Sequence, residues 1–249
     1  MATPPRILTI AGSDPSGGAG IQADIKTITM MGGYAVSAIT AITVQNTLGV
    51  QAVEVLAPEL VVAQIAACVS DIGIDAIKIG MLGSAANAHA VADVLAGMTI
   101  PVVFDPVMIA TSGGVLADAE TVAAFTRLMR LATVTTPNLP ELAALGGEAA
   151  MLSLTHHALI KGGHGEGEVV VDRLIGPAGE VTRWSDPRID TQHTHGTGCT
   201  LASAIAVGLG SGLRLEQAIT EARQFVRAAL IAAPGFGQSH GPIGHYSVR

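Results

Sequence analysis

Short runs rich in β-branched residues alternate with helical patterns along most of this 249-residue chain. The runs that predict strands are RILTIAG (6–12), AVSAITAITVQN (35–46), GVQAVEVL (49–56), AIKIG (76–80), PVVFD (101–105), ATVTTPN (132–138) and HALIKGG (157–163), followed by a hairpin of EVVVDRLI (168–175) and EVTRW (180–184). Helical patterns cover about 21–31, 58–70, 85–96, 117–131, 139–145, 198–210 and 214–232. Such alternation predicts a mostly parallel sheet with helices on both faces.

The composition fits a sheet of this kind. Hydrophobic residues make up 49% of the chain and aromatic residues only 3%, so aliphatic side chains must form the core. Aliphatic strands are typical of parallel sheets covered on both faces. No linker-like stretch or internal repeat divides the chain. We therefore expect residues 1–249 to form one α/β domain, a three-layer sandwich around a central sheet.

Charge and cysteine usage narrow the class of protein. The net charge is −7 and no basic run is present, so a nucleic-acid-binding surface is not expected. No uncharged apolar run approaches the ~18 residues of a membrane-spanning helix. The N-terminal stretch lacks the pattern of a signal peptide. Cys68 and Cys199 give no disulfide framework, so we expect a cytoplasmic protein.

Polar residues follow the predicted strands where each strand ends. In open α/β sheets, ligands bind beyond the carboxyl ends of the parallel strands. The residues at these ends are Asp14, Gln45, Asn46, Gly80, Met81, Asp105, Asn138, Glu141, Lys161 and Cys199. Turn residues are often polar for structural reasons alone, so each position is only a candidate.

A glycine-rich stretch, GSDPSGGAGIQAD (12–24), follows the first strand. It contains neither a Walker A lysine nor the G-x-G-x-x-G fingerprint of dinucleotide-binding proteins. Its glycines would still let a ligand approach the backbone closely. Asp24, in the first turns of the next helix, would accept hydrogen bonds from a ligand or favour the helix dipole.

Asp105 and the stretch NLPE (138–141) indicate a magnesium site. Mg²⁺ is usually held by one or two carboxylates together with substrate phosphates, and Asp105 and Glu141 offer that pair. A structural role is compatible with this one, since Asn138 and Glu141 also have the spacing of a helix capping box. Lys161, at the end of another strand, is either a phosphate contact or a solvated surface charge.

The stretch HTHGTGCTLASAIA (193–206) leads a glycine turn into an apolar helix. Gly196, Thr197 and Gly198 would place backbone N–H groups at the helix N-terminus, which forms an anion hole. Cys199 lies in the first turn, where we expect the pKa of its thiol to fall. Phosphoryl transfer needs both features, an anion hole and a base. The alternatives for Cys199 are a buried packing residue or a zinc ligand beside His193 and His195.

Taken together, these stretches resemble a known enzyme family. The matching motifs, in order, are IAGSDPSGGAGIQADIKT, AITVQNT, KIGML, DPVM, TPNLPE, KGGH and HGTGCTLASAIA. This set is similar to the hydroxymethylpyrimidine/phosphomethylpyrimidine kinases of thiamine biosynthesis, which belong to the ribokinase-like superfamily. The resemblance implies a ribokinase-like fold and phosphorylation of 4-amino-5-hydroxymethyl-2-methylpyrimidine by ATP, followed by phosphorylation of the monophosphate to the pyrophosphate.

The resemblance also implies roles for individual residues. For the pyrimidine it implies the binding and lining residues Asp24, Gln45, Gly12, Val44, Met81 and Val107. For Mg-ATP it implies Asp105 and Glu141 at the metal, and Asn138, Lys161 and Thr194 at the nucleotide. Gly196, Thr197 and Gly198 would form the anion hole, and Cys199 would accept the proton of the attacking hydroxyl. We also expect a homodimer.

The chain departs from the family pattern at one place. Only 18 residues, LAALGGEAAMLSLTHHAL (142–159), separate TPNLPE from KGGH. We expect a helix there to be missing or cut to a turn, on the nucleotide side of the site. This departure bears on Lys161 and on ATP affinity, and it leaves the pyrimidine pocket untouched.

Other functions compete with this interpretation. A pyridoxal or pyridoxine kinase of the same superfamily also phosphorylates a hydroxymethyl group on a ring. A non-catalytic vitamer-binding protein would keep the pocket without the chemistry, but it would have no need of Asp105, Glu141 and Cys199. The missing dinucleotide fingerprint disfavours a nucleotide-dependent oxidoreductase.

Overall fold

A computed structural model describes residues 3–109 and 114–248, so the outermost residues of the expected 1–249 domain lie outside it. Its strands are β1 (Arg6–Ser13), β2 (Tyr34–Asn46), β3 (Gly49–Val55), β4 (Ala76–Ile79), β5 (Val102–Phe104), β6 (Val134–Thr135), β7 (Ala158–Ile160), β8 (Val169–Gly176) and β9 (Gly179–Pro187). Its α-helices are α1 (Gly20–Met30), α2 (Pro58–Asp71), α3 (Ala85–Leu95), α4 (Ala119–Leu131), α5 (Leu139–Ala144), α6 (Gly147–Leu152), α7 (Thr197–Gly210) and α8 (Leu215–Ile231).

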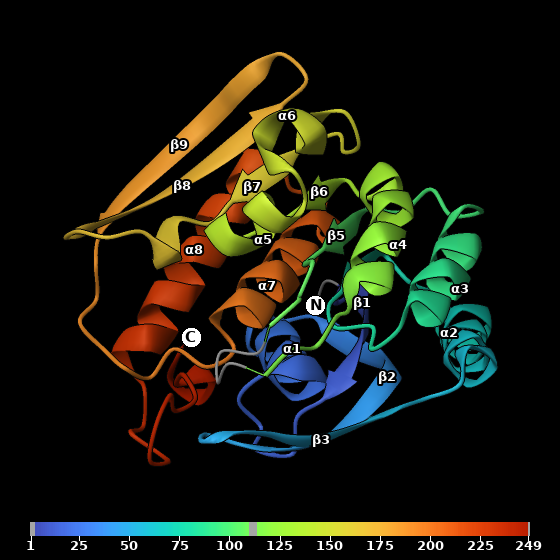
Figure 1. Ribbon diagram of the computed structural model, residues 1–249, viewed down its shortest axis with the longest axis horizontal. Coiled ribbons are helices and arrows are strands. Elements are labelled where there is room, and N and C mark those ends of the chain that lie inside the picture. The colour runs from blue at the N-terminus through green and yellow to red at the C-terminus, as the bar shows by residue number, and fades with distance from the viewer. Residues whose placement is uncertain (1–2, 110–113, 249) are drawn as a thin grey trace.

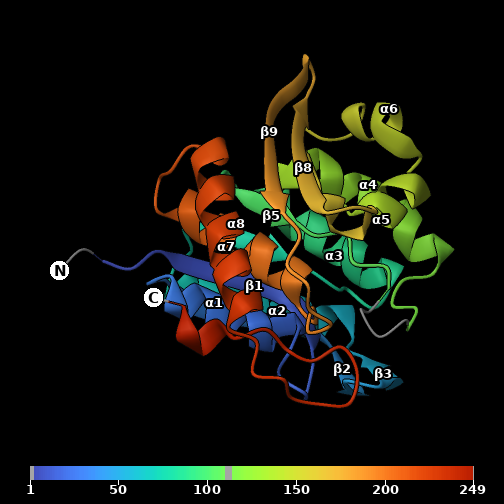
Figure 2. The same ribbon diagram turned by 90° about the vertical axis from the view of Figure 1, so that its left-hand side faces the viewer.

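The described strands form one nine-stranded sheet in the order β3-β2-β1-β4-β5-β6-β7-β8-β9. Strands β2, β1, β4, β5, β6 and β7 run parallel, whereas β3 and the β8–β9 hairpin pair antiparallel at the two edges. Helices α1, α7 and α8 cover one face of the sheet and α2, α3 and α4 the other (Figure 1). Seen from the side, the β8–β9 hairpin extends beyond the layers (Figure 2). The predicted α/β fold is confirmed.

Two apolar cores hold the layers together. One lies under α2, α3 and α4, where Phe104 and Phe125 meet edge to face with their ring centroids 5.2 Å apart. The other lies under α7 and α8 and is built from small and branched side chains such as Ala204, Ile205 and Ala218. Small residues let α7 pack close to the sheet, which places its N-terminus at the carboxyl ends of the strands.

The observed elements differ from the predicted ones mainly around β6. The predicted strand 132–138 is reduced to Val134–Thr135. The backbone N–H of Thr136 donates to the carbonyl oxygen of Phe104. The next residue, Pro137, has no N–H, so it cannot continue the hydrogen bonds between the strands. The short segment after Glu141, where we expected a helix to be missing or cut to a turn, carries the six-residue helix α6.

Candidate active site

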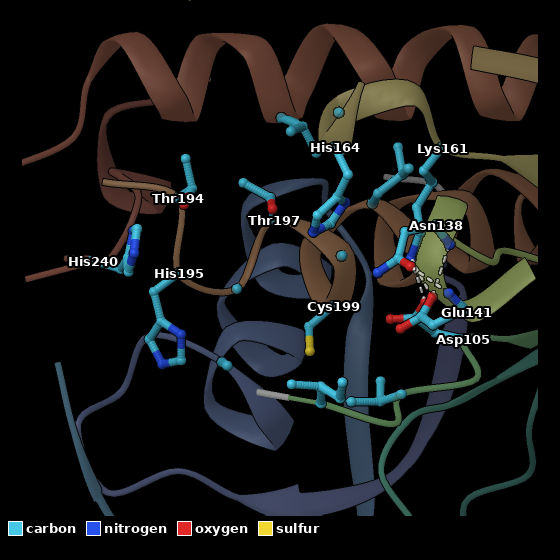
Figure 3. Close-up of a pocket in the computed structure, with 18 of the residues that line it drawn as sticks. Asp105, Asn138, Glu141, Lys161, His164, Thr194, His195, Thr197, Cys199 and His240 are labelled. Atoms are coloured by element: carbon cyan, nitrogen blue, oxygen red, sulfur yellow. Dashed lines mark hydrogen bonds and ion pairs between the residues drawn. The ribbon is translucent and has the colours of Figure 1, made fainter. Parts of the chain in front are cut away.

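A cavity of about 800 Å³ opens at the carboxyl ends of the parallel strands. The residues that form it come mainly from the ends of β1, β4, β5, β6 and β7 and the loops after them, from β2 and β8, from the loop after β9, from the N-terminus of α7 and from α8. In Figure 3, Asp105, Asn138, Glu141 and Lys161 gather on one side of the cavity, and His195 lies on the other. The Cys199 side chain lies between the two groups. The cavity therefore has two ends with Cys199 between them.

The acidic end is organised around Lys161, directly after β7. Its Nζ atom lies 2.7 Å from Asp105 Oδ1 and 3.8 Å from Glu141 Oε2. Although burial lowers the pKa of this lysine, Asp105 and Glu141 outweigh that effect and raise it. Burial raises the pKa of Glu141 to about 7, and Asp105 adds to the rise, while Lys161 opposes it. Negative charge is thus crowded here and only partly neutralised.

This end of the cavity suits a hard divalent cation. Asp105 is buried, and its Oδ1 already accepts hydrogen bonds from Thr136 and Lys161, whereas Oδ2 has no hydrogen-bond donor among the described residues. Glu141 Oε2 accepts a hydrogen bond from the backbone N–H of Asn138. Glu141 Oε1 has no hydrogen-bond donor within residues 3–109 and 114–248. Two carboxylate oxygens with free lone pairs match what Mg²⁺ takes from proteins.

The N-terminus of α7 lies at the cavity and begins with the glycine turn for which the sequence predicted an anion hole. Gly196 precedes the helix with φ +85°, and a Cβ atom there would lie 1.8 Å from the carbonyl oxygen of Gly18. Only glycine fits this position. A Cβ on Gly198 would lie 3.3 Å from Asp105 Oδ2 and 3.4 Å from Lys161 Nζ. The first turn of α7 therefore lies beside the acidic end, and within it the Thr197 N–H already donates to the Thr194 carbonyl oxygen at 3.3 Å.

Cys199 is half-buried in the first turn of α7. Burial raises the pKa of its thiol to about 11, and the carboxylates of Asp24 and Asp105 add to the rise, against Lys78. The sequence-based expectation of a lowered pKa is therefore wrong for this structure, because desolvation outweighs the helix N-terminus. No cluster of three His, Cys, Asp or Glu side chains that could hold a metal occurs in the described residues, so the zinc alternative has no support.

The other end of the cavity is less charged. It is lined by Gly12, Met81 and Val107, and its polar side chains include Gln45 and His195. Gln45 accepts a hydrogen bond from Thr43 Oγ1 at 3.2 Å, and its Nε2 lies 3.4 Å from His195 Nε2. The Gln45 amide can therefore still donate to a ring nitrogen or carbonyl of a ligand.

Comparison with known proteins identifies the family. Residues 14–244 match the phosphomethylpyrimidine kinase family. The chain belongs to this family. The hydroxymethylpyrimidine/phosphomethylpyrimidine kinase of Streptomyces coelicolor is 44% identical over 257 residues, which cover 98% of this chain and 95% of the relative. The motif resemblance noted above is thereby confirmed.

Two further relatives extend the comparison. The thiamine biosynthesis multifunctional protein of Corynebacterium efficiens is 40% identical over 261 residues, which cover 98% of this chain and 35% of that longer protein. The crystal structure of an ADP complex of Bacillus subtilis pyridoxal kinase superposes with a TM-score of 0.90 at 33% identity, covering 99% of each chain. This match confirms the ribokinase-like fold.

Most of the predicted site residues of this phosphomethylpyrimidine kinase family member line the one cavity. Those that do are Gly12, Gln45, Met81, Asp105, Val107, Asn138, Glu141, Lys161, Thr194, Gly196, Thr197, Gly198 and Cys199. The capping box predicted for Asn138 and Glu141 is also present, with reciprocal hydrogen bonds of 2.8 Å.

Two predicted ligand residues need correction. Asp24 is completely buried beneath the cavity, and its carboxylate is taken up by Lys78, Thr9 and Ser203. It is not among the residues that line the cavity. The Val44 side chain is 53% exposed on the opposite face of β2 from Thr43 and does not line the cavity either. Side chains alternate along a strand, and this alternation excludes Val44.

The structure adds contacts that the sequence did not predict. His195 Nε2 lies 2.8 Å from Asp14 Oδ2 and ties the anion-hole turn to the glycine-rich loop after β1. Burial raises the pKa of Asp14, but hydrogen bonds from His195, Ser16 and Ala19 outweigh burial and lower it. On the nucleotide side, Arg188 donates hydrogen bonds to the carbonyl oxygens of Gly163, Gly165 and Gly167 and holds that loop over the cavity. No local sequence pattern predicts the His195–Asp14 pair or the hydrogen bonds of Arg188, because the partners lie far apart along the chain.

Proposed function

We propose that this protein transfers the γ-phosphoryl group of ATP to the hydroxymethyl group of 4-amino-5-hydroxymethyl-2-methylpyrimidine, and then to the monophosphate, in thiamine biosynthesis. One observation carries the proposal. The anion-binding turn Gly196–Gly198 and Cys199 lie between an acidic, lysine-bearing end and an end suited to a small polar ring. Donor and acceptor can therefore meet at the helix N-terminus, which is what phosphoryl transfer requires.

The residues have separate tasks in this reaction. Lys161 and Asn138 would contact the nucleotide phosphates, with Thr194 bordering the same cavity, and the N–H groups of Gly196, Thr197 and Gly198 would stabilise charge on the transferred group. Asp105 and Glu141 would hold Mg²⁺, which would neutralise phosphate charge. Cys199, through the small thiolate fraction that a pKa of about 11 leaves, would accept the hydroxyl proton as the oxygen bonds to phosphorus.

The acceptor would be fixed at the other end of the cavity. Gln45 would donate a hydrogen bond to the pyrimidine, and Met81, Val107 and Gly12 would pack against its ring. A Cβ on Gly12 would lie 2.8 Å from the Met81 sulfur, so glycine at this point lets the Met81 side chain pack against the end of β1. The similarity to pyridoxal kinase makes pyridoxal the natural competing acceptor.

The experiment is a side-by-side measurement of ADP release from Mg-ATP with the pyrimidine, its monophosphate and pyridoxal as acceptors. We expect kcat/KM for the first two to exceed that for pyridoxal. A higher value for pyridoxal would make the protein a vitamin B6 kinase on the same fold. Tight pyrimidine binding without ADP release from any acceptor would make it a binding protein.

We further propose that residues 1–249 act as one kinase domain and that two chains associate. β3 lies at the edge of the sheet, and apolar side chains of β2 and β3 (Ile42, Val44, Val53 and Val55) are more than one third exposed. Edge strands with apolar exposure are sites of pairing between chains. Light scattering coupled to size-exclusion chromatography should give the mass of a dimer, and a monomer mass would contradict this proposal.

No helix in the described part of the chain has the length and apolarity to cross a membrane. We propose a cytoplasmic location on other grounds. Both cysteines are free, and ATP is the proposed co-substrate. Fractionation of cells should therefore place the protein with ATP-dependent cytoplasmic enzymes, and recovery outside the cytoplasm would contradict this.

A further inference from the structure

β4 carries a lysine whose side chain is completely buried inside the sheet. The Nζ atom of Lys78 lies 2.9 Å and 2.7 Å from the two carboxylate oxygens of Asp24 on α1. Burying two charges is costly, and an apolar pair of similar volume is often equally stable or more so. Packing alone therefore gives no reason for a lysine here.

The carboxylate of Asp24 is held on all sides. Thr9 Oγ1 on β1 donates to Asp24 Oδ2 at 2.5 Å, and Ser203 Oγ on α7 donates to Oδ1 at 2.8 Å. Together with Lys78, these bonds join two strands and two helices whose ends form the cavity. The ammonium can therefore move very little relative to α7.

This network lies directly beneath Cys199. Ser203 follows Cys199 by four residues on α7, so the two side chains share one face of the helix. A Cβ on Gly80 would lie 2.7 Å from Lys78 Nζ, which places the ammonium against the strand end that leads to Met81 in the cavity wall. Lys78 is thus a fixed charge between the core and the floor of the active site.

The charged groups around the thiol come from every element packed against it. Lys78 on β4 favours the thiolate, whereas Asp24 on α1 and Asp105 after β5 oppose it. Lys161 after β7 also interacts with the thiol, and it pairs with Asp105 and Glu141 at the acidic end of the cavity as Lys78 pairs with Asp24 in the core. Through Ser203, the Lys78–Asp24 ion pair is held one turn of α7 away from Cys199.

We propose that Lys78 is a positioning residue for proton transfer, because its fixed ammonium stabilises the thiolate of Cys199 that accepts the proton of the substrate hydroxyl. This role rests on the proposed function. In the step, the hydroxyl oxygen bonds to the γ-phosphorus while the bond from that phosphorus to the ADP oxygen breaks. The electron pair leaves with ADP, and the hydroxyl proton moves to Sγ of Cys199.

The test measures the thiolate directly. In a Cys68→Ser background, the rate at which iodoacetamide alkylates Cys199 at about pH 8 is proportional to the thiolate fraction. Lys78→Met should slow alkylation by roughly tenfold, the effect of one pKa unit. Asp24→Asn is the matched control, because it breaks the same ion pair but removes the opposing charge. It should not slow alkylation.

Folding of each variant is checked by its thermal unfolding midpoint. If Lys78→Met alone does not fold, the double variant Lys78→Met/Asp24→Leu replaces the ion pair by apolar groups and should also slow alkylation. Unchanged alkylation in the folded variant, or equal slowing by Asp24→Asn, would overturn the proposal. Alkylation needs no acceptor substrate, so its outcome is independent of whether wild-type protein phosphorylates the pyrimidine.

Discussion

The Nζ atom of Lys161 lies 2.7 Å from Oδ1 of Asp105. Lys161 thus lies between the two carboxylates that are proposed to hold a metal. Glu141 on its other side has a pKa of about 7, raised by burial and by Asp105. Binding of Mg-ATP would let Lys161 turn to the phosphates while the cation takes over the carboxylates.

Lys161→Met should therefore have opposite effects on the two ligands. KM for ATP should rise by roughly ten- to a hundredfold, because one charged hydrogen bond to phosphate is lost. Affinity for Mn²⁺ without nucleotide should increase, because the competing ammonium is gone. Steady-state kinetics and calorimetric titration measure the two effects. A weaker Mn²⁺ affinity would contradict this account of the acidic end.

Cys199→Ala should separate the two phosphorylation steps. The first acceptor is an alcohol and needs a base, so its kcat should fall by ~10²- to 10⁴-fold. The second acceptor is a phosphate whose second pKa is about 6, so its oxygen is already anionic and the loss should stay below about tenfold. Cys68→Ala, on α2 away from the cavity, is the control. Equal losses in both steps would show that Cys199 does not act as the base.

Gln45→Ala should weaken acceptor binding without affecting ATP. KM for the pyrimidine should rise by about tenfold, the cost of one lost hydrogen bond in a desolvated pocket. Val44→Ala is a matched control, since Val44 is the next residue on β2 but its side chain points away from the cavity. Equal changes in KM for the pyrimidine and for ATP in Gln45→Ala would contradict the assignment.

His245 should make the protein sensitive to acid. Burial, reinforced by Lys26, lowers its pKa from 6.5 to about 4, and its Nε2 lies 2.8 Å from Thr200 Oγ1 under α7. The unfolded chain binds a proton in this range that the folded chain does not, so the free energy of unfolding falls as the pH drops below about 6.5. The loss is about 2 kcal/mol at pH 5 relative to pH 7.

His245→Gln keeps a neutral hydrogen-bonding side chain and should remove most of this loss. Urea unfolding at both pH values measures it, with His156→Gln at an exposed position as the control. Acid sensitivity that persists undiminished in His245→Gln would place its cause at other groups.

The sheet and most helices could be predicted because they depend on local patterns. Short apolar runs such as AIKI and VVF are typical of buried strands, and both are strands in the structure. Pro58 and Asn138 are residue types that favour helix starts, and helices begin at both places. Strand ends then place candidate residues at one edge, which is why Asp105, Lys161 and Cys199 could be brought together from the sequence alone.

The errors concern long-range contacts. The position of Asp24 in the sequence predicted a ligand-binding residue. In the structure its carboxylate instead pairs in the core with Lys78, which lies 54 positions away along the chain. The thiol of Cys199 lies at a helix N-terminus, yet burial raises its pKa, and the charges that act on it come from α1, β4 and the loop after β5, which local sequence does not reveal. The pairing of His195 with Asp14 spans 181 positions and has no local signal.

The most direct test of the account follows the phosphorus through both steps. ³¹P NMR of the pyrimidine with excess Mg-ATP should show a phosphomonoester first and a pyrophosphate ester afterwards, with two ADP formed for each pyrimidine consumed. Formation of ADP and inorganic phosphate without either ester, or no change in the spectrum, would contradict the proposed phosphoryl transfer.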